Sequence, residues 1–385
     1  MKTSAFIIFL TIVILVYGLT NYYIYSRAIQ AVPSGHSYRL WFTVIFWILV
    51  FAYVLARILE KACPCDFTEI VTWIGSFWLG IMAYAFFTVL IIDIARLGNH
   101  FFHFFPASFY ADYQKTKFIL LLVSSGIIVL IVTAGFINAR ITRIKNVEVE
   151  INKKVPGDKS IKIVMVSDIH MGTLIAKHMT NNLVEKIIKL KPDLVLFAGD
   201  IVDEDLAPVI RRNLGEMLTK ITAKYGIYGI TGNHEYIGGV EPAVKYLREH
   251  GIHMLRDTAV LVDDVFYIVG RDDRDKPRFT GRERKPLSDI MANVDRSYPV
   301  ILMDHQPFNL SKTVEQGVDL QLSGHTHHGQ LWPFNYITKA IYELSWGYKK
   351  IGETHFYVSS GFGSWGPPIR LGNRPEIVVI RVRFR

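Results

Sequence analysis

Cysteine is almost absent from this chain: its 385 residues include only Cys63 and Cys65, which flank Pro64. Two thiols cannot form a four-ligand zinc site by themselves, and they exclude the disulfide framework of a small secreted domain. The chain also lacks internal repeats and low-complexity segments. No basic run is interleaved with aromatic residues, so the net charge of +9 does not indicate a nucleic-acid partner.

Charged residues are scarce in the first third of the chain. Residues 1–145 hold eleven Lys/Arg and five Asp/Glu, so six of the nine net positive charges belong to this part. These charges flank four apolar runs of roughly 20 residues, the length that a helix needs to cross a bilayer. Helices of a soluble domain rarely stay apolar on every face over that distance, which disfavours that alternative.

We therefore predict a transmembrane domain at residues 1–145 with four spans, at about 5–25, 40–59, 73–94 and 118–137. The first run is followed by no small-residue cleavage site, so we interpret it as a retained anchor and not as a signal peptide. Lys and Arg number six on the side that holds both chain ends and five on the other. This small excess favours a multi-pass protein of the inner (plasma) membrane with its C-terminal domain in the cytoplasm.

Residues 146–385 have a different character. Short apolar runs alternate with amphipathic stretches, two of which, 177–191 and 207–223, have the pattern of helices. This alternation predicts a second domain of mixed α/β class with buried strands.

Side chains that commonly bind metals follow five of the predicted strands. They are Asp168 and His170, Asp200, Asn233 with the neighbouring His234, His305, and His325 with His327. Ligands of open α/β sheets gather outside the carboxyl ends of strands, so we expect these residues to share one site. Within each pair spaced by two, an extended chain would point both side chains to the same face.

Seven of these residues are candidate metal ligands: Asp168, His170, Asp200, Asn233, His305, His325 and His327. Seven are too many for one ion, and a carboxylate such as Asp200 can bridge two. Mixed carboxylate, imidazole and amide ligands suit two divalent ions, with manganese favoured and iron or zinc as alternatives. Such a centre favours phosphoester hydrolysis, for which His234 is the catalytic candidate, either to protonate the leaving oxygen or to stabilise charge on the phosphoryl group.

The blocks "DIH", "GD", "GNHE", a lone His and "GHTH" occur in this order and resemble the calcineurin-like metallophosphoesterases over roughly residues 146–385. The resemblance implies a two-sheet sandwich flanked by helices. It also implies that Asp168, His170 and His327 bind one metal and that Asn233, His305 and His325 bind the other. Asp200 would bridge the two metals, and His234 would act on the substrate.

The tail "GFGSWGPPIRLGNRPEIVVIRV" is similar to that of a membrane-associated bacterial branch of this family. That branch usually has GHTHGGQ, whereas here His328 replaces the first Gly of GGQ. His328 and Arg370 are therefore possible substrate-binding residues. The alternatives are that His328 is a tolerated surface residue and that Arg370 forms an ion pair with Glu376.

The sequence thus predicts a membrane-embedded dimetal phosphoesterase that hydrolyses a phosphodiester or a pyrophosphate bond. Some relatives in this branch cleave the pyrophosphate of UDP-diacylglucosamine, so a lipid-linked substrate is a hypothesis for this chain. The alternative is a membrane-anchored, non-catalytic scaffold or sensor that uses the fold to bind a partner. Such a protein typically lacks some of the ligands, whereas here every ligand block is present.

Overall fold

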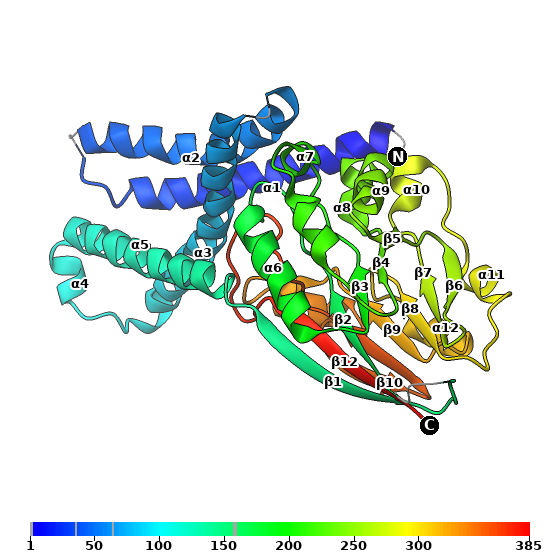
Figure 1. Ribbon diagram of the computed structural model, residues 1–385. Helices are drawn as coiled ribbons and strands as arrows, with labels where there is room; N and C mark the ends of the chain where they lie inside the picture. The colour runs from blue at the N-terminus through cyan, green and yellow to red at the C-terminus, as the bar shows by residue number, and fades with distance from the viewer. Residues whose placement is uncertain (1–2, 35–36, 64, 157–159) are drawn as a thin grey trace. The chain divides into compact units, whose positions relative to one another are not determined.

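The computed structural model describes residues 3–34, 37–63, 65–156 and 160–385 (Figure 1). The chain divides into two compact units. The helical unit comprises 1–137 with 366–369, and the sheet unit comprises 138–365 with 370–385. The predicted boundary near residue 145 lies within β1 (Arg143–Ile151), which already belongs to the sheet unit because it pairs with β12 (Glu376–Phe384) from Arg143 onward.

Five helices account for most of the helical unit. They are α1 (Thr3–Ile29), α2 (Ser37–Ala62), α3 (Asp66–Phe102), α4 (Ser108–Ala111) and α5 (Tyr113–Asn138). Among the described residues, three segments are long and apolar enough to cross a membrane: 37–60, 66–102 and 113–138. The first predicted span forms α1, but the side chains of residues 3–6 and 9 lie outside the described ones. A fourth span therefore stays a prediction.

Polar contacts and a small residue hold α1, α2 and α3 together. The indole N–H of Trp78 donates to Oδ1 of the fully buried Asn21 at 3.0 Å, and the hydroxyl of Tyr17 donates to the Val50 carbonyl at 2.7 Å. A Cβ at Gly75 would lie 2.5 Å from the backbone of Tyr53, so glycine lets α3 approach α2. Such contacts are typical of helices packed within a bilayer.

The sheet unit contains two six-stranded mixed sheets, in agreement with the predicted two-sheet architecture. The first has the order β1-β12-β2-β3-β4-β5 and adds β2 (Ser160–Val166), β3 (Leu194–Ala198), β4 (Ile227–Ile230) and β5 (His253–Met254). The second has the order β10-β11-β9-β8-β7-β6. Its strands are β6 (Thr258–Val262), β7 (Phe266–Gly270), β8 (Val300–Met303), β9 (Leu320–Ser323), β10 (Gly347–Ile351) and β11 (Thr354–Val358).

Helices flank these sheets. They are α6 (Lys177–Leu190), α7 (Ala207–Arg211), α8 (Asn233–Gly238), α9 (Val240–Glu249), α10 (Lys276–Thr280), α11 (Leu287–Met291), α12 (Leu310–Glu315) and α13 (Asn335–Ile341). The predicted helix at 177–191 is confirmed as α6. The single helix predicted at 207–223 is wrong, because Asn213 adopts a left-handed conformation, with φ of 47°, between α7 and the 3-10 helix η1 (Leu214–Lys220).

The main apolar core lies between the two sheets, with Met165 and Leu196 from the first and Ile301 and Leu322 from the second. A second core joins the first sheet to α6 and α9. In the first sheet β2, β3 and β4 run parallel, and in the second β7, β8 and β9 do. The carboxyl ends of parallel neighbours meet at one edge, which is the condition for a shared site.

Candidate metal centre

The predicted ligands come together in two neighbouring groups. One consists of Asp168, His170 and His327, and the other contains Asp200, His305 and His325. Within each group the ligand atoms lie within 4.8 Å of one another. The structure therefore brings together residues that are up to 159 positions apart in the sequence.

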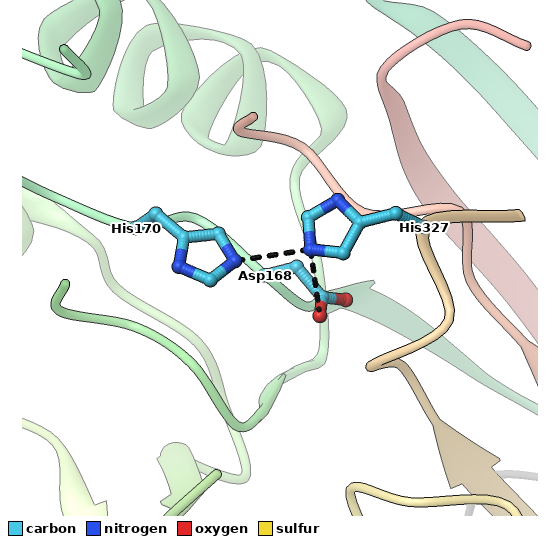
Figure 2. A group of neighbouring side chains, drawn as sticks. All are labelled: Asp168, His170 and His327. Carbon is cyan, nitrogen blue, oxygen red and sulfur yellow. Dashed lines mark hydrogen bonds and ion pairs between the residues drawn. The ribbon is translucent and has the colours of Figure 1, made fainter. Parts of the chain in front are cut away.

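The first group combines the end of β2 with the turn after β9. Figure 2 shows the imidazoles of His170 and His327 pointing toward each other above the carboxylate of Asp168. The two Nε2 atoms are 3.0 Å apart, and Nε2 of His327 lies 3.4 Å from Oδ1 of Asp168. Two imidazole nitrogens and a carboxylate oxygen facing one point are a ligand set for a divalent cation.

The second group lies at the ends of β3, β4, β8 and β9. Nε2 of His305 is 3.0 Å from Oδ2 of Asp200, and Nδ1 of His325 is 2.8 Å from Oδ1 of Asn233. Oδ2 of Asp200 is also 3.9 Å from Nε2 of His170, which belongs to the first group. Asp200 therefore reaches both groups, as a bridging carboxylate must.

The chemistry of His305 fits a cation. Its Nδ1–H donates to the carbonyl of Ala198 at 2.7 Å, so Nε2 is the nitrogen that faces Asp200. Burial alone would lower the pKa of His305, but the carboxylate of Asp200 raises it well above its usual value. This buried Nε2 has no hydrogen-bond partner, yet it faces the carboxylate of Asp200. A lone pair opposite a carboxylate is unfavourable unless a proton or a cation lies between them. A backbone carbonyl that fixes the ring in this way is typical of metal-ligating histidines.

Burial also prepares His325 to act as a ligand. Burial, together with the nearby His305, lowers the pKa of His325 to about 3. The ring is therefore neutral at physiological pH and has a lone pair available, as a metal ligand requires.

Left-handed backbone is concentrated at this site. Five of the seven ligands have positive φ: Asp168, His170, Asp200, His325 and His327, with values from 45° to 69°. Such conformations are uncommon outside glycine and cluster at functional sites. The expectation that Asp168 and His170 lie on one face of an extended chain was therefore wrong in its geometry, because both follow β2 in left-handed turns.

Two glycines make room for the carboxylates. A Cβ at Gly232 would collide with the side chain of Asp200, and a Cβ at Gly324 would collide with those of Asp168 and Ser167. The glycines of "GNHE" and "GHTH" are thus needed for close approach, which explains why each precedes a ligand block.

His234, the candidate acid, is the second residue of α8 and is 5% exposed. Its ring centroid lies 4.4 Å from that of His170. Its Nδ1 lies 3.0 Å from Oδ1 of Asp203. Burial alone would lower the pKa of His234, but the carboxylates of Asp200 and Asp203 raise it to about 10. The protonated ring can therefore donate a proton at neutral pH. Asp203 lies 31 residues before His234 in the chain, so no local pattern in the sequence connects the two residues.

Glu235 has a structural role at the site. Its buried carboxylate accepts hydrogen bonds from the backbone N–H groups of Asp200, Ile201, Val202 and Gly232, at 2.7 to 3.1 Å. These bonds tie the loop after β3 to the loop after β4 and so hold Asp200 next to Asn233.

Arg370 and His328 are buried among protein groups. The fully buried guanidinium of Arg370 donates to the Ser360 carbonyl at 2.7 Å and lies 3.1 Å from Nδ1 of His327. Nδ1 of His328 is 3.2 Å from the hydroxyl of Ser345, and its ring packs against Trp346. These contacts favour positioning roles, and substrate binding by either residue stays a prediction.

Known proteins are similar to this chain in sequence. A family model described as calcineurin-like phosphoesterase matches residues 161–329. An uncharacterized metallophosphoesterase of Campylobacter jejuni is 30% identical over 98% of this chain and 99% of its own length. A transmembrane protein with metallophosphoesterase domain from Bos taurus is 31% identical over 63% of this chain and 58% of its own.

Among solved structures, a 5'-nucleotidase precursor from Thermus thermophilus aligns with a TM-score of 0.37 and 14% identity, over 58% of this chain and 54% of that one. That likeness is too low to carry an argument. The Campylobacter protein, which matches nearly the full length, and the matched family model are both described as phosphoesterases. Two groups of candidate metal ligands are compatible with that description. The chain belongs to the calcineurin-like phosphoesterase family.

Proposed function

We propose that this protein is a membrane-embedded, dimetal phosphoesterase that hydrolyses a phosphodiester or a pyrophosphate bond. The observation that carries the proposal is the complete ligand set, divided into two groups that Asp200 connects. Two divalent cations held there would neutralise phosphate oxygens and lower the pKa of an attacking water. The ligands suit manganese, with iron and zinc as alternatives.

His234 supplies the acid in this proposal. Asp203 holds its Nδ1, so Nε2 is the nitrogen free to donate a proton to the leaving oxygen. Arg370 lies behind the ligands, and its packing against the ring of His327, with 3.1 Å between the guanidinium and Nδ1, restricts the movement of that ring. Side chains that are fixed before the substrate binds can orient a phosphoester for in-line displacement.

A lipid-linked substrate is supported by an apolar rim beside the ligands, formed by Trp332, Tyr336, Ile337 and Ile341. Trp332 lies three residues before α13 and the other three lie on that helix, and all four are 52% to 61% exposed. The rim adjoins the site: a Cβ at Gly329 would collide with the backbone at the start of α13, and the rings of Tyr342 and His325 are 6.1 Å apart. Exposed aromatic and aliphatic residues of this kind suit acyl chains.

The second candidate function is a membrane-anchored, non-catalytic scaffold or sensor. In both hypotheses we place the sheet unit in the cytoplasm. The scaffold hypothesis is less well supported, because a binding module has no need for seven intact ligands on a strained backbone.

The test is release of phosphate or nucleotide by the purified full-length protein supplied with manganese. Substrates are a generic phosphodiester, cyclic nucleotides and a UDP-linked lipid. We expect hydrolysis by the wild type and its loss in His327→Ala, with an unchanged far-UV circular dichroism spectrum. Absence of turnover on every substrate, with metal bound, would favour the scaffold.

A rim variant separates the two substrate classes. Ile337→Ser should weaken hydrolysis of the UDP-linked lipid and leave the soluble diester unaffected. Ile210→Ser, which changes an equally exposed isoleucine on α7, is the matched control. Equal effects on both substrates would remove the support for a lipid-linked substrate.

A further inference from the structure

The helical unit contains a large cavity, separate from the metal centre. Its volume is about 1040 Å³, and its walls come from α1, α2, α3, α4 and α5. This is at the upper end of the roughly 300–1,000 Å³ that ligand sites occupy. Voids left by imperfect side-chain packing are far smaller, so this hollow is large enough to accommodate a ligand.

The cavity is polar at one end and apolar elsewhere. Arg27 near the end of α1, Asp93 and Arg96 late in α3, and Lys117 early in α5 line the polar end. Apolar residues such as Trp78, 15 positions before Asp93 on the same helix, line the remainder. Fifteen helical residues rise roughly 22 Å, more than half of the ~30 Å hydrocarbon core of a bilayer.

The polar end carries an excess of positive charge. Three cationic side chains and one carboxylate line it. Nε of Arg27 lies 2.8 Å from Oδ2 of Asp93, and Nη1 of Arg96 lies 3.3 Å from Oδ1 of the same carboxylate. One carboxylate cannot neutralise both guanidiniums, and Lys117 adds a third positive charge.

Hydrogen bonds fix the shape of this end. The amide of Asn99, 8% exposed, donates to the hydroxyl of Tyr110 at 2.5 Å and accepts from the backbone N–H of Phe105 at 2.6 Å. The Gln114 amide donates to the Ala31 carbonyl at 3.0 Å, which joins the start of α5 to the end of α1. These bonds hold the backbone of this end, and Asp93 holds the side chains of Arg27 and Arg96 by its ion pairs with them.

We infer that the cavity binds one anionic phospholipid, with its head group at Arg27, Arg96 and Lys117 and its acyl chains along the apolar wall. A net negative head group complements the excess positive charge, whereas a zwitterionic one adds none. An acyl chain matches the depth and apolar lining of the cavity, and three of the helices that line it, α2, α3 and α5, are apolar enough to span a membrane. The inference does not depend on hydrolysis.

The test uses the full-length, delipidated protein in detergent. Phosphatidylglycerol, phosphatidylcholine or inorganic phosphate is added, the melting temperature is followed, and native mass spectrometry counts bound lipids. We expect phosphatidylglycerol to raise the melting temperature with one lipid retained, phosphatidylcholine to do so weakly, and inorganic phosphate to have no effect. Equal shifts with both lipids, or many lipids bound without saturation, would overturn the inference.

Two variants probe the two halves of the cavity. Ala85→Phe fills its apolar part, and the double change Arg96→Gln with Lys117→Gln removes two positive charges from its rim. We expect the double variant to bind phosphatidylglycerol about 10- to 30-fold more weakly. Arg57→Gln is the control, since Arg57 pairs with Glu60 on α2 and is not among the described residues lining the cavity. If Ala85→Phe fails to fold, the double variant decides, and unchanged affinity there refutes the inference.

Discussion

Single side chains at the metal centre depend on partners far away in the sequence. His234 and Asp203 are one example, since the carboxylate raises the pKa of the imidazole and so keeps it protonated. His327 and Arg370 are another. In both pairs the sequence identified the histidine as a candidate site residue. The contact between the histidine and its distant partner is visible only in the structure.

Asp203→Asn removes a carboxylate that raises the pKa of His234. A lower pKa deprotonates the ring at lower pH, so hydrolysis should decline on the alkaline side at lower pH than in the wild type. We also expect a decrease of about 10- to 100-fold in the rate at neutral pH. The check is the pH dependence of kcat on a soluble phosphodiester, with the exposed Asp289→Asn as control. An unshifted alkaline limb would mean that Asp203 does not set the protonation of His234.

Arg370→Lys keeps the charge and loses the planar fork of donors. Because the guanidinium is fully buried, an ammonium there leaves acceptors such as the Asn373 amide oxygen without a partner. The free energy of unfolding should fall by about 1.5–3 kcal/mol, and bound metal should decrease as His327 loosens.

Arg374→Lys is the matched control for this variant. Arg374 lies in the same tail and donates to Asn138 from an exposed position, so we expect a change below about 0.5 kcal/mol. Denaturation of both variants in detergent provides the comparison. Equal stability losses would show that burial of Arg370 is not the reason.

At the scale of elements, the ends of the strands determine the site. β2, β3, β4, β8 and β9 each lead into a segment that carries candidate ligands, and left-handed backbone orients those that follow β2, β3 and β9. Alternating apolar runs predicted these strands well. The split of 207–223 into α7 and η1 was missed, because a single left-handed residue, Asn213, decides it.

Gly324→Ala tests the turn after β9. The added methyl would collide with Asp168 and Ser167, so the turn must shift and carry His325 and His327 with it. We expect a loss of about 1–3 kcal/mol in stability together with reduced metal content. Gly126→Ala on α5, where nothing lies within 4 Å of the added methyl, is the control. Unchanged metal content in Gly324→Ala would contradict this account of the turn.

At the scale of the whole molecule, the bound metals should stabilise the sheet unit as well as activate it. The ligands come from both sheets, so cations held between them cross-link the sandwich. A ligand present at 100 times its Kd adds about 2.7 kcal/mol to the stability of the folded state.

Chelation of the purified full-length protein should therefore lower the melting temperature, and manganese should restore it. His327→Ala should respond less to both treatments, because one group has lost a ligand. Thermal unfolding monitored by intrinsic fluorescence measures the effect. The metal-bound resting state would be contradicted if the purified wild type contained no metal and chelator left its melting temperature unchanged.

The sequence by itself determined the apolar helices, the alternation of strands and helices, and which seven residues are candidate metal ligands, because hydrophobic periodicity and short motifs are local properties. Only the tertiary structure decided which strand ends meet, that Asp200 reaches both groups, and that Arg370 is buried behind His327. It alone also formed the cavity with a cationic end. These features depend on side chains up to hundreds of positions apart, and their proximity is fixed by the packing of the sheets and helices, which no local pattern encodes.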